Sequence, residues 1–208
     1  PLIGVNIGKN AVTPINKATD DYLICLKKAY QLADYITINI SSPNTKNLRS
    51  LQGKDQLHQL LATLKAEQNA LHAHYGKYTP LVVKLAPDMS DEELLESIDV
   101  IKAIELDGVI ATNTTLSRAE VQGLEHADEA GGLSGGPLTV KSTRVVQTLT
   151  QHLPASIPVI AAGGIMNGDD ALAKITAGAE LVQVYSGFIY AGPKLLEDIN
   201  EKLIDYQS

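Results

Sequence analysis

The chain alternates short apolar runs with longer amphipathic stretches from one end to the other. The apolar runs have the length of buried β-strands and lie at residues 2–7, 35–40, 81–86, 108–113, 158–163 and 181–186. Each is followed by a stretch with helical periodicity, at residues 20–33, 54–74, 90–104, 139–152, 168–177 and 193–203. The third stretch begins with Ser-Asp-Glu-Glu at 90–93, which predicts a capping box. This alternation predicts an α/β fold built from parallel βαβ units.

Two architectures fit this alternation, a doubly wound sheet and a closed (β/α) barrel. Polar residues interrupt four apolar runs near their carboxyl ends: Asn6, Asn39, Lys84 and the pair Thr112-Asn113. A barrel builds its site from the ends of several strands, whereas a doubly wound sheet concentrates ligands at one switch point. The spread favours the barrel. Since a complete barrel has eight strands and about 250 residues, we expect residues 1–208 to form one catalytic domain, a (β/α)8 TIM barrel lacking about two N-terminal βα units.

The composition is that of an ordinary globular protein and argues against several classes of function. The 208 residues are 44% apolar and carry a net charge of −7, which offers no basic surface for nucleic acid. No apolar run reaches the roughly 18 residues of a membrane span. Cys25 is the only cysteine, so no disulfide forms within the chain and we expect a buried structural thiol. The histidines have no cysteine or carboxylate at ligand spacing, so we expect no metal site.

Residues 39–45, with the sequence NISSPNT, place amides and hydroxyls on a loop directly after an apolar run. Pro43 cannot donate to a sheet ladder, so it ends the strand and stiffens the loop. One interpretation is an Asx or Ser turn that satisfies its own backbone. The other is a binding site for a planar, amide-rich ligand, because positioned loops often carry sites.

Lys84 lies inside the apolar run at 81–86, where an unpaired ammonium group is costly to bury. An anionic group should therefore face it. That group could be a carboxylate in a structural ion pair. The functional alternatives are a lysine that forms a Schiff base and a cation that stabilises an anionic cofactor.

Two glycine-rich turns, GGLSGGP at 131–137 and AGGI at 162–165, allow backbone donors to approach an anion. Barrels often bind phosphate with the loops after their last two strands, and the second turn and residues 185–187 occupy those places. Each turn alone is equally compatible with a simple tight turn. The long connection at 115–137 is expected to be a site loop.

Seven motifs occur along the chain in a recognisable order. They are GVNIGKN at 4–10, NISSPNT at 39–45, LRSLQ at 48–52, VKLAPD at 83–88, ATNTT at 111–115, GGLSG at 131–135 and LVQVYS at 181–186. Together they resemble the quinone-dependent, membrane-associated class of dihydroorotate dehydrogenases over the whole length of the chain. Ser42, where the soluble class has a cysteine, separates the two classes.

The resemblance implies an FMN flavoenzyme that oxidises dihydroorotate to orotate in the biosynthesis of pyrimidines (UMP) and passes the electrons to a quinone. It also implies peripheral attachment to the cytoplasmic face of the bacterial inner membrane. In that family the quinone tunnel and the membrane contact belong to a small helical piece. We expect that piece to lie before Pro1.

The resemblance also implies roles for particular residues. Ser42 matches the catalytic base, although strand parity alone would have selected Ser41, and Thr114 or a water would complete a proton relay. The substrate-binding positions are Asn39, Asn44, Asn113 and Thr114. The flavin-binding positions are Asn6, Asn39, Lys84, Thr112, Gly135, Gly164, Tyr185 and Ser186. The alternatives are a lyase or aldolase barrel with Lys84 as a Schiff base, and a non-catalytic piece that binds only with a missing portion.

Overall fold

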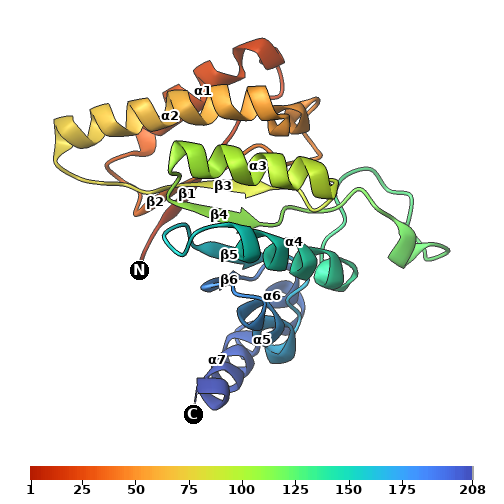
Figure 1. Cartoon of the computed structure of the whole chain (residues 1–208). Coiled ribbons are helices and arrows are strands. Elements are labelled where there is room, and N and C mark those ends of the chain that lie inside the picture. The colour runs from red at the N-terminus through yellow and green to blue at the C-terminus, as the bar shows by residue number, and fades with distance from the viewer. Residues whose placement is uncertain (208) are drawn as a thin grey trace. The chain divides into compact units, whose positions relative to one another are not determined.

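A computed structural model describes residues 1–207 of the chain and shows strands and helices in alternation (Figure 1). The strands are β1 (Gly4–Ile7), β2 (Tyr35–Asn39), β3 (Leu81–Leu85), β4 (Gly108–Ala111), β5 (Val159–Ala162) and β6 (Leu181–Gln183). The helices are α1 (Ala18–Ala29), α2 (Lys54–Tyr75), α3 (Asp91–Ile104), α4 (Thr139–His152), α5 (Gly168–Thr176), α6 (Ser186–Ala191) and α7 (Lys194–Gln207). Every predicted strand and helix is present, and α6 is an addition.

The strands are hydrogen-bonded neighbours in chain order, β1-β2-β3-β4-β5-β6. The pairs β1 with β2, β2 with β3, and β5 with β6 are parallel. A doubly wound sheet reverses its strand order at a switch point, and these six strands do not reverse. The order therefore agrees with the barrel prediction and argues against the doubly wound alternative. The eight-strand count remains an expectation.

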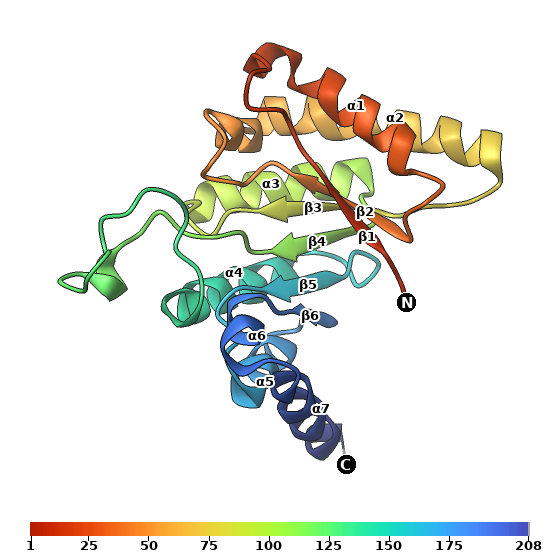
Figure 2. The same ribbon diagram turned by 180° about the vertical axis from the view of Figure 1, so that it is seen from behind.

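The chain divides into two compact units. The first comprises Pro1–Leu85 and Met89–Val109, and the second comprises Ala86–Asp88 and the chain from Ile110 onward. In the first unit, Val5 lies opposite Ile36, and Ile36 lies opposite Leu81. Helices α1, α2 and α3 lie on one side of β1, β2 and β3 (Figure 1), and Figure 2 shows these strands from behind. The buried isoleucines of β2 and leucines of α2 form the core of this unit.

Asp107, just before β4, joins α2 to the start of β3. Its carboxylate accepts hydrogen bonds from Lys65 Nζ at 3.0 Å, Gln68 Nε2 at 2.7 Å and the amide of Leu81 at 2.8 Å, and Tyr78 also donates to it. Burial alone would raise the pKa of Asp107, but these donors, led by the Leu81 amide, hold it below its ordinary value. A charged network thus joins the segment before β4 to α2 and to the amino-terminal end of β3.

Local signals set the start of α3 as the sequence predicts. Ser90 Oγ accepts the amide of Glu93 at 3.2 Å, and Glu93 Oε2 accepts the amide of Ser90 at 2.7 Å, so the capping box is confirmed. Cys25 lies half-buried on α1, so the expected buried thiol is only partly covered. Positions at the margin of the apolar face of an amphipathic helix remain partly open to solvent.

The second unit packs α5 and α7 around a small core of Ile165, Ala171, Leu195 and Ile199. The expected strand at 181–186 ends instead at Gln183, because Tyr185 leaves the extended conformation at φ −140° and ψ −76° and α6 begins at Ser186.

Among residues 1–207, no helix is long and apolar enough to cross a membrane. The same residues contain no group of three or more His, Cys, Asp or Glu that could hold a metal ion.

Candidate functional site

The loop after β2 begins at Asn39, whose carboxamide is held by the loop itself. Asn39 Oδ1 accepts hydrogen bonds from the amide and the hydroxyl of Ser41, both at 3.3 Å. The backbone oxygen of Asn39 accepts the hydroxyl of Tyr22 at 2.7 Å. The Asx turn that the sequence allowed is therefore present. It orients the carboxamide, which is half-buried at the end of the strand.

Ser41 and Ser42 differ in what their hydroxyls can reach. Ser41 is fully buried and bonded to Asn39, whereas Ser42 is half-buried. Ser42 Oγ accepts the amide of Asn44 at 3.3 Å, and its hydroxyl can still donate to a further acceptor. Access therefore favours Ser42 over Ser41, the serine that strand parity selected.

Arg49 forms a further contact that holds this loop. Its Nε donates to the backbone oxygen of Ser41 at 3.0 Å. Arg49 lies on a 3-10 helix, Leu48–Gln52, which buries Leu48 and Leu51. The segment that carries Ser42 is thus held by β2 on one side and by this helix on the other. Arg49 belongs to the motif LRSLQ at 48–52, but the sequence alone predicts no role for it.

Register places Asn6, Asn39 and Lys84 on one face of the first unit's strands. Asn6 lies opposite Thr37, and Asn39 lies opposite Lys84. Because side chains alternate between the faces of a strand, Thr37 and Asn39 share a face, and their partners point to the same side. Three of the expected flavin-binding residues therefore lie on one polar face.

Lys84 is half-buried and forms no hydrogen bond or ion pair with any residue that the structure describes. The structural ion pair allowed by the sequence is therefore not found within residues 1–207. Desolvation lowers the pKa of the Lys84 ammonium, with no neighbouring charge to oppose it. Such a group favours an anionic ligand beside it.

In the second unit, the segment after β4 carries Thr112, Asn113 and Thr114. The amide of Thr112 donates to the backbone oxygen of Ala162 at 2.6 Å, and Thr112 is buried. Asn113 Oδ1 accepts the amide of Thr114 at 2.8 Å. The carboxamide of Asn113 is therefore also held by a local backbone amide, although by that of the next residue rather than the second.

Asp88 holds the continuation of this segment. Its carboxylate accepts hydrogen bonds from the hydroxyl of Thr115 and from the amide of Leu116, the latter at 2.8 Å. Lys141 on α4 forms an ion pair with it at 2.9 Å. All four residues belong to the second unit. Sequence patterns do not predict these contacts of Asp88, because Asp88, Thr115 and Lys141 lie far apart in the sequence.

The glycine-rich turn at 131–137 lies against the start of α6. Ser134 Oγ is 2.8 Å from Ser186 Oγ. Gly135 has φ +82°, which favours glycine, and a Cβ on it would lie 3.6 Å from the Cβ of Ser186. The structure therefore brings together Gly135 and Ser186, two expected flavin contacts that are distant in sequence.

The second glycine turn packs tightly on α4. A Cβ on Gly164, which has φ +72°, would lie 2.3 Å from Thr139 Cα. A Cβ on Gly187 would lie 2.2 Å from the backbone oxygen of Ile165. Close packing within the protein therefore requires glycine at both positions, whether or not a ligand binds there. Tyr185, beside them in sequence, has an exposed side chain.

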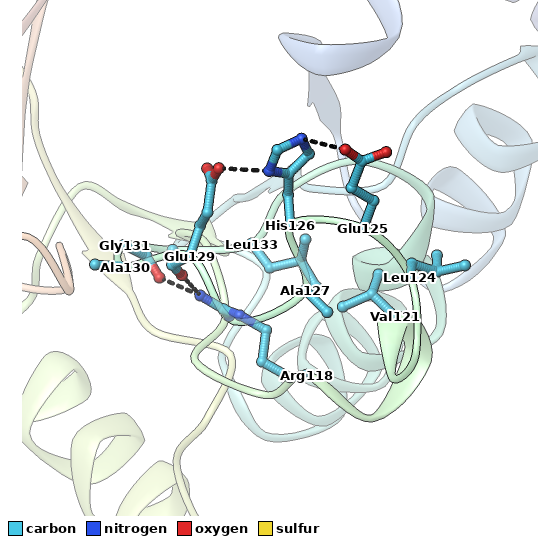
Figure 3. Close-up of a pocket in the computed structure, with 11 residues that line it drawn as sticks. Arg118, Val121, Leu124, Glu125, His126, Ala127, Glu129, Ala130, Gly131 and Leu133 are labelled. Atoms are coloured by element: carbon cyan, nitrogen blue, oxygen red, sulfur yellow. Dashed lines mark hydrogen bonds and ion pairs between the residues drawn. The ribbon is translucent and has the colours of Figure 1, made fainter.

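The long connection at 115–137 lines an open pocket of about 310 Å³ (Figure 3). Arg118, one of the lining residues, donates to the backbone oxygens of Glu129 at 3.0 Å and Gly131 at 2.6 Å. His126 lies between two glutamates on the rim, with Nδ1 at 2.9 Å from Glu129. None of the expected substrate or flavin residues lines this pocket.

Each unit thus holds its own group of expected site residues. The first contains Asn6, Asn39, Ser42, Asn44 and Lys84. The second contains Thr112, Asn113, Thr114, Gly135, Gly164, Tyr185 and Ser186. Within each group the residues lie at the carboxyl ends of strands or on the loops that follow, where an α/β barrel places its site.

Comparison with known proteins identifies the family. A family profile with the description "Dihydroorotate dehydrogenase" matches residues 1–206. A protein of Dechloromonas aromatica named "Dihydroorotate dehydrogenase (quinone)" is 56% identical over 202 residues, which are 97% of this chain and 58% of that protein. A protein of the same name from Neisseria meningitidis is 55% identical over 197 residues, which are 95% of this chain and 59% of that protein.

Two solved structures of high similarity support the same family. DHODH from Eimeria tenella in complex with ferulenol has a TM-score of 0.92 and 39% identity, and covers 99% of this chain and 57% of its own. The ligand-free form of that protein has a TM-score of 0.91 and is 41% identical. The match covers 98% of this chain and 59% of the chain of that structure. The chain spans just under three fifths of the length of these relatives. By profile, identity and structure, the chain belongs to the dihydroorotate dehydrogenase family.

Proposed function

We propose that this chain binds FMN and dihydroorotate in a quinone-dependent dihydroorotate dehydrogenase of pyrimidine biosynthesis. The reaction oxidises dihydroorotate to orotate, with a quinone as final electron acceptor. The observation that carries the proposal is Lys84, which lies in register with Asn39 and has no anionic partner among the described residues. Ser42 follows on the same loop as Asn39.

The residues fit FMN in both units. FMN supplies a hydride acceptor for carbon 6 of the substrate. In the first unit, Lys84 would stabilise negative charge on the flavin ring, with Asn6 and Asn39 on the same strand face. In the second, Thr112, Gly135, Gly164, Tyr185 and Ser186 would hold the remainder, with the glycine turns and Ser186 at the phosphate.

Removal of the proton from carbon 5 falls to Ser42 in this proposal. A serine hydroxyl is weakly basic, so negative charge on Oγ must be stabilised as the proton moves. The amide of Asn44, which donates to Ser42 Oγ at 3.3 Å, does so. As Oγ takes the proton from carbon 5, the hydroxyl's own proton would pass to Thr114 or a water. Asn39, Asn44 and Asn113 offer the alternating donors and acceptors that a pyrimidine dione requires.

A Schiff-base lyase is the second candidate, because the lowered pKa of Lys84 also suits a nucleophilic amine. Two carboxamides oriented by local backbone amides favour recognition of a neutral ring instead. Membership of the dihydroorotate dehydrogenase family favours the same conclusion.

Contact with quinone and with the cytoplasmic face of the bacterial inner membrane forms part of the same proposal. We expect both to depend on the portion of the relatives' length that residues 1–208 do not match.

Anaerobic spectroscopy tests the proposal directly. Protein loaded with FMN should lose its flavin absorbance when dihydroorotate is added without oxygen and regain it when a quinone follows. Lactate, a hydride donor without the pyrimidine ring, is the control and should leave the spectrum unchanged. Failure to bind flavin, or flavin that dihydroorotate does not reduce, would contradict the proposal.

A further inference from the structure

Lys174 on α5 is a fully buried ammonium group to which the proposed reaction assigns no role. Its Nζ donates to Thr139 O at 2.9 Å, Ser142 Oγ at 2.6 Å and Thr143 Oγ1 at 2.5 Å. All three acceptors are neutral and lie within the first five residues of α4. Lys174 forms no ion pair with any residue that the structure describes, and Asp170, one turn earlier on α5, is the charge that acts on it.

This placement is unfavourable for an isolated cation. Burial lowers the pKa of Lys174 to about 8, although Asp170 opposes the shift. The amino-terminal turn of α4 adds the positive end of a helix dipole beside the ammonium group. A nearby anion would favour the charged form of such a group.

The acceptors of Lys174 also hold the second glycine turn. Ser142 Oγ donates to the backbone oxygen of Gly163 at 2.8 Å, and Thr139 Oγ1 donates to that of Gly164 at 2.6 Å. Both carbonyls therefore point toward α4. In a trans peptide the N–H lies opposite the C=O, so the amides of Gly164 and Ile165 point away from α4.

These two amides are an independent sign of a ligand. Gly164 and Ile165 are buried, and neither amide donates to any residue within the described part of the chain. Buried backbone donors in proteins are almost always paired. Successive amides that point the same way form an anion-binding concavity.

We propose that Lys174 is the positioning residue of a phosphomonoester site at the glycine turn. It orders the first turn of α4, which turns the peptide groups of Gly163 and Gly164 so that two amides face the anion. Its charge offsets that of the phosphate from behind the turn. The inference rests on the proposed function, because it takes the phosphate of FMN as the anion.

Comparing FMN with riboflavin, which lacks the phosphate, isolates this role. Dissociation constants for both flavins are measured by fluorescence titration of the complete protein. Lys174→Met should reduce the preference for FMN over riboflavin by about tenfold or more, as expected for the loss of one nearby charge at low dielectric. Riboflavin affinity should stay the same. A merely structural role would weaken both flavins equally and leave the ratio unchanged.

Two further variants complete the test. Lys202→Met removes a lysine of α7 that is paired with Asp169 at the surface, at 2.6 Å, and should leave the ratio unchanged. Ser142→Ala keeps the charge of Lys174 but removes the hydrogen bond to Gly163. It should reduce the preference for FMN over riboflavin by a smaller factor than Lys174→Met. This variant still tests the proposal if Lys174→Met does not fold.

The outcomes separate the two proposals. A wild-type protein without preference for FMN overturns the phosphate site, and the role of Lys174 with it. A wild-type preference that survives in Ser142→Ala, and in Lys174→Met where it folds, overturns the role of Lys174 alone.

Discussion

The candidate side chains differ in how their polar groups are used within the chain. Asn39 and Asn113 each commit a carboxamide oxygen to a local amide, which fixes their orientation. Ser42 accepts one weak hydrogen bond, and Lys84 forms none with the described residues. Oriented carboxamides with an uncommitted cation and hydroxyl are the distribution expected where a ligand completes the hydrogen bonding.

The role of Ser42 predicts a kinetic defect without a binding defect. Ser42→Ala should slow flavin reduction by dihydroorotate by about 10²- to 10⁴-fold, the usual range for a positioned base. Flavin content should not change, because Ser42 is not among the expected flavin contacts. Stopped-flow absorbance measures the rate. Ser50→Ala, which removes a hydroxyl bonded only locally to Asn47, is the control. A wild-type rate in Ser42→Ala would refute the assignment.

The role of Lys84 predicts a change in the flavin itself. Lys84→Met should weaken FMN retention or lower the reduction potential of bound FMN, because a cation near the ring stabilises its reduced, anionic form. Flavin titration and a spectroelectrochemical potential measure the two effects. Lys46→Met, an exposed lysine of the same unit, should change neither. Borohydride trapping of a covalent adduct between Lys84 and substrate would instead support the Schiff-base alternative.

At the scale of elements, an expected site residue and a stabilising network lie at opposite ends of β3. Lys84 lies near the carboxyl end of β3, whereas the Asp107 network joins α2 to the amino end of the same strand. In barrels the carboxyl ends bear the site and the opposite face bears on stability. Variants at the two ends of β3 should therefore affect different properties.

Asp107→Asn should destabilise the protein without changing flavin affinity. Loss of a carboxylate with four donors is expected to cost about 2–4 kcal/mol in the free energy of unfolding, measured by urea denaturation near neutral pH. Asp99→Asn, at an exposed ion pair with Lys102, should have little effect. Equal stabilities of the two variants would contradict the importance of the network.

The pH dependence of stability provides a second check on Asp107. Its folded pKa lies below the ordinary value of 3.8, so the unfolded chain binds the proton more readily. The contribution of Asp107 is therefore complete above the unfolded pKa and is lost as the pH falls through the folded value. The stability difference between wild type and Asp107→Asn should shrink below about pH 4.

At the scale of the whole molecule, large apolar side chains are exposed on the second unit around α6. Tyr185, Ile189 and Tyr190 are 79%, 70% and 83% exposed. Clustered apolar exposure of this kind promotes association in water. The sequence pattern did not predict it, because residues 181–186 were expected to form a strand and α6 was not expected.

The purified chain should therefore associate in a concentration-dependent manner in sedimentation velocity experiments. The double substitution Ile189→Ser with Tyr190→Ser should reduce association by removing apolar surface. Leu32→Ser, which removes a single exposed leucine of the first unit, is the matched control and should not. A chain that remains monomeric at all concentrations would show that this surface is not adhesive.

The sequence by itself determined the alternation of strands and helices, the capping box of α3 and membership of the family. Strand and helix periodicity and caps depend on residues a few positions apart, so they can be read locally. The motif residues around Asn39, Lys84 and Asn113 could be named in the same way, although their roles remain predictions.

Only the tertiary structure decided how those residues are supported. The anchoring of the Ser42 loop by Arg49, the pairing of Asp88 with Lys141 and the burial of Lys174 behind Gly163 and Gly164 are all tertiary contacts. The end of β6 at Gln183 also depends on packing. Beyond it the chain approaches the backbone of Ile165 so closely that position 187 must be glycine. Except for the short link from Arg49 to Ser41, these contacts join residues more than twenty positions apart. Such partners are set by how helices and strands pack, and no periodicity along the chain encodes them.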